Sequence, residues 1–535
     1  MKKIIVYIIT IHSLFLNAQI GFNSNTFIAS RSDIETNFYK KDSTANALVL
    51  YEYGNSYVDK NEFVFILEEQ QKIKILNKEG YKHATISVYL RKNNNKKESI
   101  ENIFGFTHNL ENGKIVKTRL LKENIFREEY NEDYDIVKFT LPNIKEGSVI
   151  TYSYKIISYS MLNFRNWHFQ GEIPRLYSEY ETSIPENLDY NVQLVGKHNF
   201  FDTSSAVELN CLNTGKSRTP DCSKFVYIMK DVPAFIEEKH LTSRYNYLSH
   251  LEYKLKTFTD FNGYFTNYTK TWKDVDRELR DNENIGEQLS IKIKAEKILP
   301  IEIINEENTL IRATQIYKYV QENYFWNKKV QIFNDVSIKK LLENKSGNVA
   351  SINILLHNLL KACNIKVKPV LLSTRGNGFA SKLFPVIYDF NYMITQVSID
   401  GKNFLLDATD KYLSFGQLPF KTLNHYGRLL DLKKGSEWID ISPLHTSSSN
   451  HMISLKLNKN QNLIGNVKSK YTGYIALNKK KKYYTNNENY LEKLENKSLN
   501  IKINNYNVTS TDKNSLDFSE NYDVKHIAEN TGDLI

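Results

Sequence analysis

Apolar and polar residues alternate along much of the first half of the chain. Two such runs, residues 137–141 and 149–154, are separated by residues 142–147, a segment rich in turn formers. Side chains of a β-strand point alternately to its two faces, so this alternation predicts half-buried strands, and the segment between the runs predicts a hairpin turn. We therefore expect residues 19–245 to form a β-sandwich-like domain.

Helical spacing replaces the alternation further along the chain. Residues 246–300 are predicted to be a connector that holds one more strand and a helix around 272–289. A longer helix is predicted where apolar residues recur at intervals of three and four, because this spacing places them on one wide buried face. These residues are Ile352, Leu355, Leu356, Leu359, Leu360 and Cys363.

Strand patterns return after residue 425. Residues 453–457 and 471–477 are predicted strands, and a short polar helix is expected near 486–494. The last strand pattern stops before Ile535 without a closing element, so we expect the C-terminal domain to be either incomplete or frayed at its natural end. The chain is thus predicted to be a multidomain α+β protein, with a β-sandwich-like, a central α+β and a β-rich C-terminal domain at residues 19–245, 301–425 and 426–535.

The first residues have the pattern of a secretory signal peptide. Lys2 and Lys3 supply positive charge, residues 4–16 are mostly apolar, and the small residue Ala18 precedes a polar one. We expect residues 1–18 to be removed by cleavage near Ala18, and the protein to be exported to a periplasm or out of the cell. An uncleaved anchor is the alternative. No other stretch reaches the ~18 apolar residues that a spanning helix needs, so no membrane span is predicted.

Composition narrows the range of partners. The chain has 71 basic and 61 acidic residues, which give a net charge of +10 and a pI near 8.9. Without a nucleic-acid-binding motif, this balance argues against a nucleic-acid partner, and the lysine run 479–482 is predicted to be solvated surface. Acidic, histidine and cysteine residues lack the paired spacing of metal ligands, and no phosphate-binding or dinucleotide glycine loop is present. Neither a metal nor another cofactor is expected.

Two of the three cysteines flank a polar segment that is predicted to be a loop. Cys211 and Cys222 could close a small disulfide in an oxidising compartment, but the sequence does not give the Cα separation that a disulfide requires. Bonded and free cysteines therefore both remain open. Cys363 lies about three turns along the long apolar helix and is expected to be a buried structural thiol.

The centre of the chain places its elements in a specific order. Residues 346–352 open the long apolar helix, residues 365–375 form a strand that ends near a glycine-containing loop, and residues 390–397 and 403–409 flank the hairpin turn at 400–401. This order resembles the transglutaminase-like superfamily of papain-like cysteine hydrolases. In that superfamily a Gly-Asp-Cys motif opens a core helix, a histidine lies on a following strand and an aspartate on the next. The resemblance implies a papain/transglutaminase-like α+β fold for the central domain.

A second resemblance concerns the N-terminal domain. Residues 167–170, 172–174, 178–180 and 184–186, followed by 230–234, are similar to an uncharacterised β-rich domain. That domain commonly precedes transglutaminase-like domains in exported bacterial proteins. It has no established activity, so the resemblance informs the architecture and not the function.

Matched to the catalytic motif, the chain keeps one position of three. Val349 stands where the cysteine belongs, Tyr392 where the histidine belongs, and Asp407 is retained. Valine has no nucleophilic atom, and tyrosine, with a reference pKa of about 10, is a poor base at neutral pH. With Asp400 and Gly401 as the turn, Tyr392 and Asp407 are predicted to be diagonal neighbours on one face, roughly 7–8 Å apart between backbones. We therefore expect the backbone arrangement of the triad to be retained, without the nucleophile and the base.

Four further residues are candidates for lining the former catalytic cleft: Gly347, Asn348, Ser351 and His425. Ser351 lies in the first turn of the helix, where a serine more often caps or is solvated than reacts. His425 follows the last strand expected for this domain.

Two functional hypotheses follow. The first is an exported non-catalytic protein that binds a peptide, a glycan or a partner protein in the cell envelope, either in the old cleft or with that cleft closed by a Tyr392–Asp407 hydrogen bond. The second is a cysteine-independent amide hydrolase or transferase that uses Ser351 or a displaced histidine. The absence of an intact nucleophile, base and orienting residue favours the first, a pseudoenzyme. The oligomeric state is left open.

Overall fold

A computed structural model describes residues 27–526 except 94–95, 132, 160–163, 216–218, 269, 460–461, 497–500 and 511–514. The predicted signal peptide, residues 1–18, lies outside these residues. The chain divides into two compact units, residues 1–238 with 247–267, and residues 239–246 with 268–535. Within the described residues, no helix combines the length and the apolar character that crossing a membrane demands.

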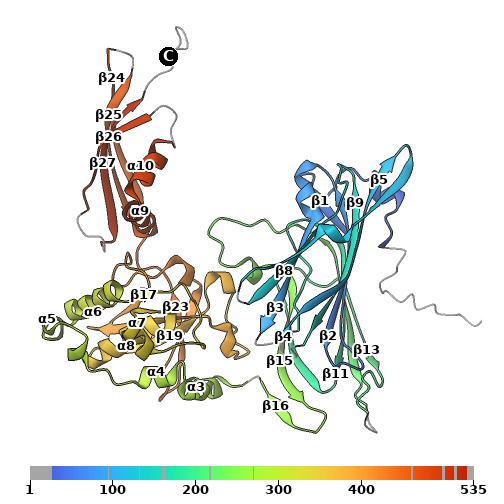
Figure 1. The fold of residues 1–535 in the computed structure, drawn as a ribbon, viewed down its shortest axis with the longest axis horizontal. Helices are drawn as coiled ribbons and strands as arrows, with labels where there is room; N and C mark the ends of the chain where they lie inside the picture. Colours follow the sequence, from blue (N-terminus) through green and yellow to red (C-terminus); the bar gives the residue numbers. More distant parts are fainter. Residues whose placement is uncertain are drawn as a thin grey trace, which may run out of the picture. The chain divides into compact units, whose positions relative to one another are not determined.

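The first unit is built on an eight-stranded sheet, with the strand order β13-β14-β11-β1-β2-β9-β5-β6 (Figure 1). Its one parallel pairing joins β1 to β11, and its other pairings are antiparallel. The short helix α2 (Arg31–Glu35) precedes the sheet. The strands are β1 (Ala47–Val58), β2 (Phe65–Ile75), β5 (Ser99–Glu111), β6 (Lys114–Arg119), β9 (Val149–Ser158), β11 (Arg175–Pro185), β13 (Asp202–Glu208) and β14 (Cys222–Val232).

Two smaller sheets share a hydrophobic core with this large sheet. Trp167 stacks on Tyr180 with 4.9 Å between ring centroids, and a Cβ at Gly54 would lie 2.2 Å from the Trp167 ring, so only glycine fits there. Layers of sheet around one core explain the alternating pattern of the sequence. The smaller sheets contain β3 (Thr85–Asn93), β4 (Lys96–Lys97), β7 (Ile125–Glu129) and β8 (Tyr134–Thr140), and β10 (Trp167–His168), β12 (Leu188–Val195), β15 (His250–Thr259) and β16 (Phe265–Asn267).

Two details of the first unit bear on the sequence predictions. The boundary at residue 245 was wrong for β15 and β16, because β15 pairs along its length with β12 and so belongs to the first unit rather than to a connector. Cys211 and Cys222 are joined by a disulfide, with a Cα separation of 5.8 Å, and both are buried. The pairing that the sequence left open is therefore formed.

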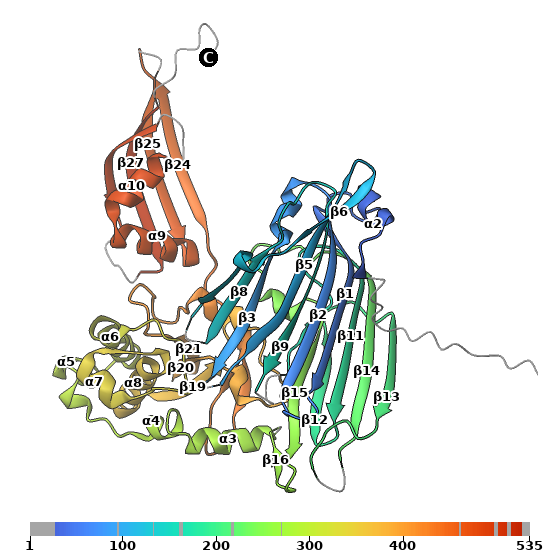
Figure 2. The ribbon, with the colours of Figure 1, turned by 45° about the vertical axis from the view of Figure 1, so that its right-hand side comes forward.

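The central part of the second unit packs helices against a five-stranded antiparallel sheet, in the order β21-β20-β19-β22-β23 (Figure 2). Every residue of its central helix from Val349 to Leu360 is buried. The helices are α3 (Trp272–Asp281), α4 (Gly286–Ser290), α5 (Ile301–Ile304), α6 (Thr309–Asn323), α7 (Ile338–Asn344) and α8 (Val349–Ala362). The strands are β17 (Phe325–Trp326), β18 (Ser346–Gly347), β19 (Lys366–Leu372), β20 (Tyr392–Ile399), β21 (Lys402–Leu406), β22 (His425–Leu429) and β23 (Glu437–Ile441).

The C-terminal part of this unit is a four-stranded antiparallel sheet with two helices, α9 (Gly473–Thr485) and α10 (Asn487–Glu495). The strand predicted at 471–477 was wrong beyond residue 472, because Gly473 turns the backbone into the left-handed region (φ 58°) and α9 begins there. The run 479–482 is not a purely solvated surface, since Lys480 is 1% exposed and donates to the Ser515 carbonyl. The strands are β24 (Ser449–Leu457), β25 (Leu463–Thr472), β26 (Ile501–Val508) and β27 (Asp517–His526).

Candidate functional site

Val349 is the first residue of α8 and is fully buried. The helix starts here because Asn348 caps it: the Asn348 side-chain oxygen accepts the Ser351 backbone N–H at 2.9 Å. The amide nitrogen of Asn348 donates to the carbonyls of residues 334 and 335, each at 3.1 Å, which fixes the preceding loop. A side chain at position 349 therefore sits at a helix N-terminus, where the helix dipole would stabilise a thiolate. Valine has no ionisable group that this helix N-terminus could stabilise.

The β20–β21 hairpin brings Tyr392 to Asp407. Asp400 and Gly401 both have positive φ, 49° and 76°, as a type I′ turn requires. Ile399 pairs with Lys402, which is the register that the turn predicts. Pairing ends at Leu406, so Asp407 lies one residue beyond the strand, and the Tyr392 hydroxyl donates to Asp407 Oδ2 at 2.7 Å.

The second oxygen of Asp407 is occupied as well. Its Oδ1 accepts from the Asn353 side-chain amide at 3.2 Å and from the Thr409 backbone N–H at 2.9 Å. Asn353 also accepts the Ala408 N–H at 3.0 Å, so this one amide joins α8 to the end of the hairpin. Asn353 was missed by sequence reasoning, although a lone asparagine on an apolar helix face is a signal, because a buried amide needs partners.

Burial determines what Tyr392 can do. Tyr392 and Asp407 are each 0% exposed, and Tyr392 packs in an apolar cluster with Val349 and Leu372. Burial, and secondarily the negative charge of Asp407, raises the pKa of Tyr392 well above its usual value. The phenol therefore stays protonated and acts as a hydrogen-bond donor, not as a base.

Lys421 is a second residue that sequence reasoning missed. Its ammonium lies 3.9 Å from the ring centroid of Trp326 and 4.7 Å from that of Tyr392. Burial lowers its pKa, and the charges of Asp407 and Asp410 oppose this effect. Lys421 thus covers the tyrosine ring as a cation–π partner. No periodic pattern marks it in the sequence.

The remaining candidates do not form a catalytic set. Ser351 is buried and its hydroxyl accepts the Ser337 N–H at 3.1 Å. Gly347 lies in the short strand β18, where its neighbour in β17 is Trp326. His425 is exposed on β22, with its ring 5.3 Å from Phe379. Asn348 and Ser351 were candidates for lining a cleft, but both are buried, and hydrogen bonds within the fold occupy their polar side-chain atoms.

The hydrogen bonds of Asp407 show which groups surround it. The contacts of Asp407 in the described residues come from tyrosine, asparagine and backbone groups, and include no serine, cysteine or histidine side chain. Cys363 is free and buried at the C-terminal end of α8, and burial raises the pKa of its thiol. Across the described residues, no group of three or more acidic, histidine or cysteine side chains could hold a metal ion.

The fold and this site define a multidomain, strand-rich chain of mixed α and β structure. Residues 67–210, all within the first unit, match the family described as a domain of unknown function with solved structure, DUF3857. No curated protein matches the chain. A solved structure from Parabacteroides distasonis, described as a "putative protease", is similar over 90% of this chain and 94% of its own, with 11% sequence identity and a TM-score of 0.48.

Proposed function

We propose that this chain is an exported pseudoenzyme, in which the central region, residues 301–425, retains a transglutaminase-like fold and uses the old triad positions for structure. The DUF3857 match supports this reading, since that domain is found in proteins associated with transglutaminase-like domains. The role that follows is binding without cleavage, of a peptide, a glycan or a partner protein in the cell envelope.

One observation carries the proposal: the buried Tyr392–Asp407 hydrogen bond beside Val349. A cysteine hydrolase needs a nucleophile, a base within hydrogen-bond reach and a carboxylate that orients the base. Here the nucleophile position is a valine, the base position is a tyrosine held protonated, and the carboxylate is saturated with donors. The same contacts that prevent catalysis stabilise the junction between α8 and the hairpin.

Of the two forms of this hypothesis, burial favours the closed one. Val349, Tyr392 and Asp407 are all 0% exposed, so a ligand in the old site would have to open the core. A separate cavity of about 250 Å³ lies beside the same apolar cluster. It combines apolar walls with the polar side chains Gln396, Asn403, Gln417, Asp440 and His445. Amide side chains suit the hydrogen-bonding groups of a peptide or a glycan.

The alternative, a hydrolase or transferase of altered chemistry, has less support. Ser351 is engaged with the Ser337 backbone, and the contacts found for it include no histidine. His357 is buried, its Nδ1 lies 2.8 Å from the Asn358 side-chain oxygen, and burial lowers its pKa to about 4. Neither residue presents a nucleophile–base pair.

The test has a catalytic arm and a binding arm. We expect the purified protein to show no amide hydrolysis and no amine incorporation into fluorogenic peptide substrates above the level of an Asp407→Asn variant. Turnover that the Asp407→Asn change abolished would overturn the proposal. In the binding arm, arrays of short peptides and oligosaccharides are probed with the wild type and with Gln396→Leu. The exposed Gln193→Leu in the first unit is the matched control, and only Gln396→Leu is expected to lose binding.

A further inference from the structure

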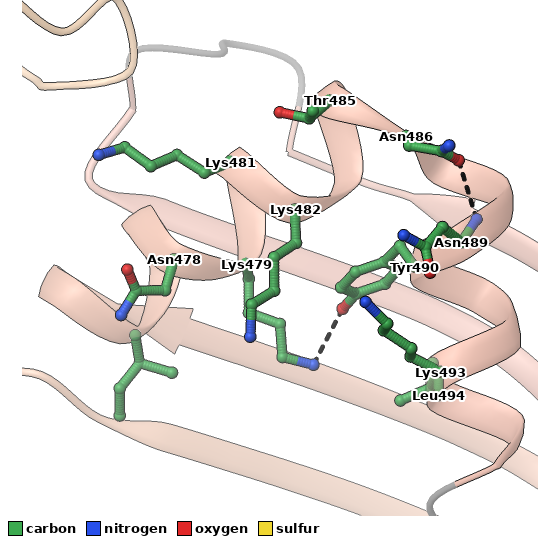
Figure 3. A pocket seen from close by; sticks show the side chains of 11 residues that line it. Asn478, Lys479, Lys481, Lys482, Thr485, Asn486, Asn489, Tyr490, Lys493 and Leu494 are labelled. Carbon is green, nitrogen blue, oxygen red and sulfur yellow. Dashed lines mark hydrogen bonds between the residues drawn. The ribbon is translucent and has the colours of Figure 1, made fainter. Parts of the chain in front are cut away.

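Helices α9 and α10 line an open cavity of about 590 Å³, a size typical of small-molecule sites. Figure 3 shows the side chains around it. None of the eleven lining residues is acidic, and four are lysines. They are Ile475, Asn478, Lys479, Lys481, Lys482, Thr485, Asn486, Asn489, Tyr490, Lys493 and Leu494.

The four lysines are not equivalent. Lys479 donates to Glu520 at 3.0 Å and to the Tyr490 hydroxyl at 2.9 Å, so its charge is compensated. Lys481 forms an ion pair with Asp410 and points away from the other three in Figure 3. Lys482 and Lys493 are exposed and form no ion pair with any residue that the structure describes. The uncompensated positive charge of the cavity therefore resides on these two side chains.

The floor of the cavity is fixed in place. Tyr490 is 7% exposed and its hydroxyl donates to Glu520 at 2.6 Å, while Tyr471 and Tyr506 donate to the same carboxylate at 2.8 Å each. In Figure 3 the Lys479 ammonium lies next to the Tyr490 hydroxyl, and Lys482 and Lys493 come from α9 and α10. The tyrosine and Lys479 thus form a fixed base for the cavity, which lowers the entropic cost of holding a ligand.

The residues that line the cavity indicate the chemical class of its ligand. Ile475 and Leu494, with the aliphatic stems of the lysines, provide an apolar surface. The side-chain oxygen of Asn486 accepts the Asn489 N–H at 2.9 Å, which fixes the start of α10. Lysine ammonium groups favour phosphate, and the apolar wall favours a ligand that also has an apolar body.

We propose that this cavity binds an amphiphilic phosphate ester, with the phosphate between Lys482 and Lys493 and the apolar body against Ile475 and Leu494. Such a group comes either from a free phosphorylated small molecule or from an anionic phospholipid headgroup. No residue that lines the cavity belongs to the Tyr392–Asp407 site, and the proposal does not depend on whether that site is catalytic.

The test measures binding of the full-length exported chain to hexyl phosphate by calorimetry, and to vesicles of phosphatidylglycerol and phosphatidylcholine by co-sedimentation. The double variant Lys482→Gln/Lys493→Gln keeps the side-chain length and removes both charges. The matched control is Lys456→Gln/Lys502→Gln. It removes two charges from exposed positions of β24 and β26, strands of the C-terminal four-stranded sheet. Hexanol tests whether the phosphate is needed.

We expect the cavity variant to weaken binding at least tenfold and the control to change it less than twofold. Binding of hexyl phosphate identifies the free ester as a source, and binding of phosphatidylglycerol vesicles alone identifies the membrane. Three results would overturn the proposal: no binding by the wild type in either arm, equal loss in both double variants, or equal binding of hexanol and hexyl phosphate.

Discussion

Two buried carboxylates in the second unit are held by tyrosine hydroxyls, and they are used differently. Asp407 accepts from one tyrosine, one asparagine and one backbone N–H, and forms no ion pair among the residues that the structure describes. Glu520 accepts from three tyrosines and pairs with Lys479 at 3.0 Å. Both residues are at most 1% exposed.

The two arrangements differ in whether a cavity remains beside the carboxylate. The Asp407 arrangement fills its own space with Val349 and the Tyr392 ring, so the former catalytic position is closed. The Glu520 arrangement supports the floor of the α9–α10 cavity, where Lys482 and Lys493 form no ion pair with any residue that the structure describes. A buried carboxylate must have its charge compensated. A carboxylate paired with a cation depends less on any one hydrogen bond than a carboxylate held by hydrogen bonds alone. Asp407 should therefore be sensitive to its donors, and Glu520 to loss of the carboxylate itself.

The largest effect is expected from Glu520→Ala. This change leaves Lys479 and three tyrosine hydroxyls without their shared acceptor, and removal of one partner of a buried pair costs about 3–5 kcal/mol. Hydrogen exchange of the backbone amides in α9 and β27 measures the loss of local stability. The exposed Glu488→Ala in α10 is the control and should have little effect. Equal protection in both variants would show that the Glu520 contacts do not stabilise this sheet.

Next in size is a pair of matched tyrosine variants. Tyr392→Phe removes the hydroxyl that donates to Asp407 Oδ2, the one donor to this oxygen among the residues that the structure describes. The loss of a hydrogen bond to a charged group costs roughly 1.5–3 kcal/mol. Tyr506→Phe removes one of three hydroxyls on Glu520 and should cost only about 0.5–1.5 kcal/mol. Local hydrogen exchange of β20 and β26 gives both values. If Tyr506→Phe proves the costlier change, the contrast between the two sites is wrong.

The sequence predicts the elements around Asp407 well, because local patterns determine them. The apolar period marks α8, and Asp400 and Gly401 determine the hairpin turn and its register. The contact of Tyr392 with Asp407 follows from that register. Asn353 does not follow, since its role depends on a hairpin that lies about 40 residues further along the chain.

Elsewhere, tertiary partners override the local pattern. Tyr471, Gly473 and Leu477 read as an alternating strand, yet the chain leaves the sheet at Gly473 and buries Leu477 from a helix. Lys480 is of a residue type that usually lies on the surface, and it is buried because its ammonium donates to the carbonyl of Ser515, 35 positions away. β15 cannot be assigned to the first unit until its partner β12 is known. These features depend on long-range pairing, which a single sequence does not encode locally.

A third prediction tests whether the closed site still has catalytic geometry. Val349→Cys/Tyr392→His, made in a Cys363→Ser background, places a thiol at the N-terminus of α8 with an imidazole next to Asp407. We expect the thiol pKa to fall at least one unit below its usual value of about 8.5, which corresponds to about 1.4 kcal/mol. The pH dependence of iodoacetamide alkylation gives this pKa. Asp407→Asn in the same background should raise it again, and an unshifted thiol would mean that position 349 is not the old nucleophile position.

The smallest effect is the dependence of the Glu520 site on pH. Hydrogen bonds from tyrosines and the charge of Lys479 outweigh burial and lower the pKa of Glu520 below its usual 4.5. A carboxyl whose pKa is lower in the folded state stabilises the fold above its unfolded pKa, and this contribution is lost as the pH falls through the folded value. The stability difference between the wild type and Glu520→Gln, measured by hydrogen exchange in α9, should therefore be constant above about pH 5 and shrink at lower pH. A difference that grew with acidification would mean that burial dominates and that Glu520 is protonated in the fold, in which case Lys479 would carry an uncompensated charge into the cavity.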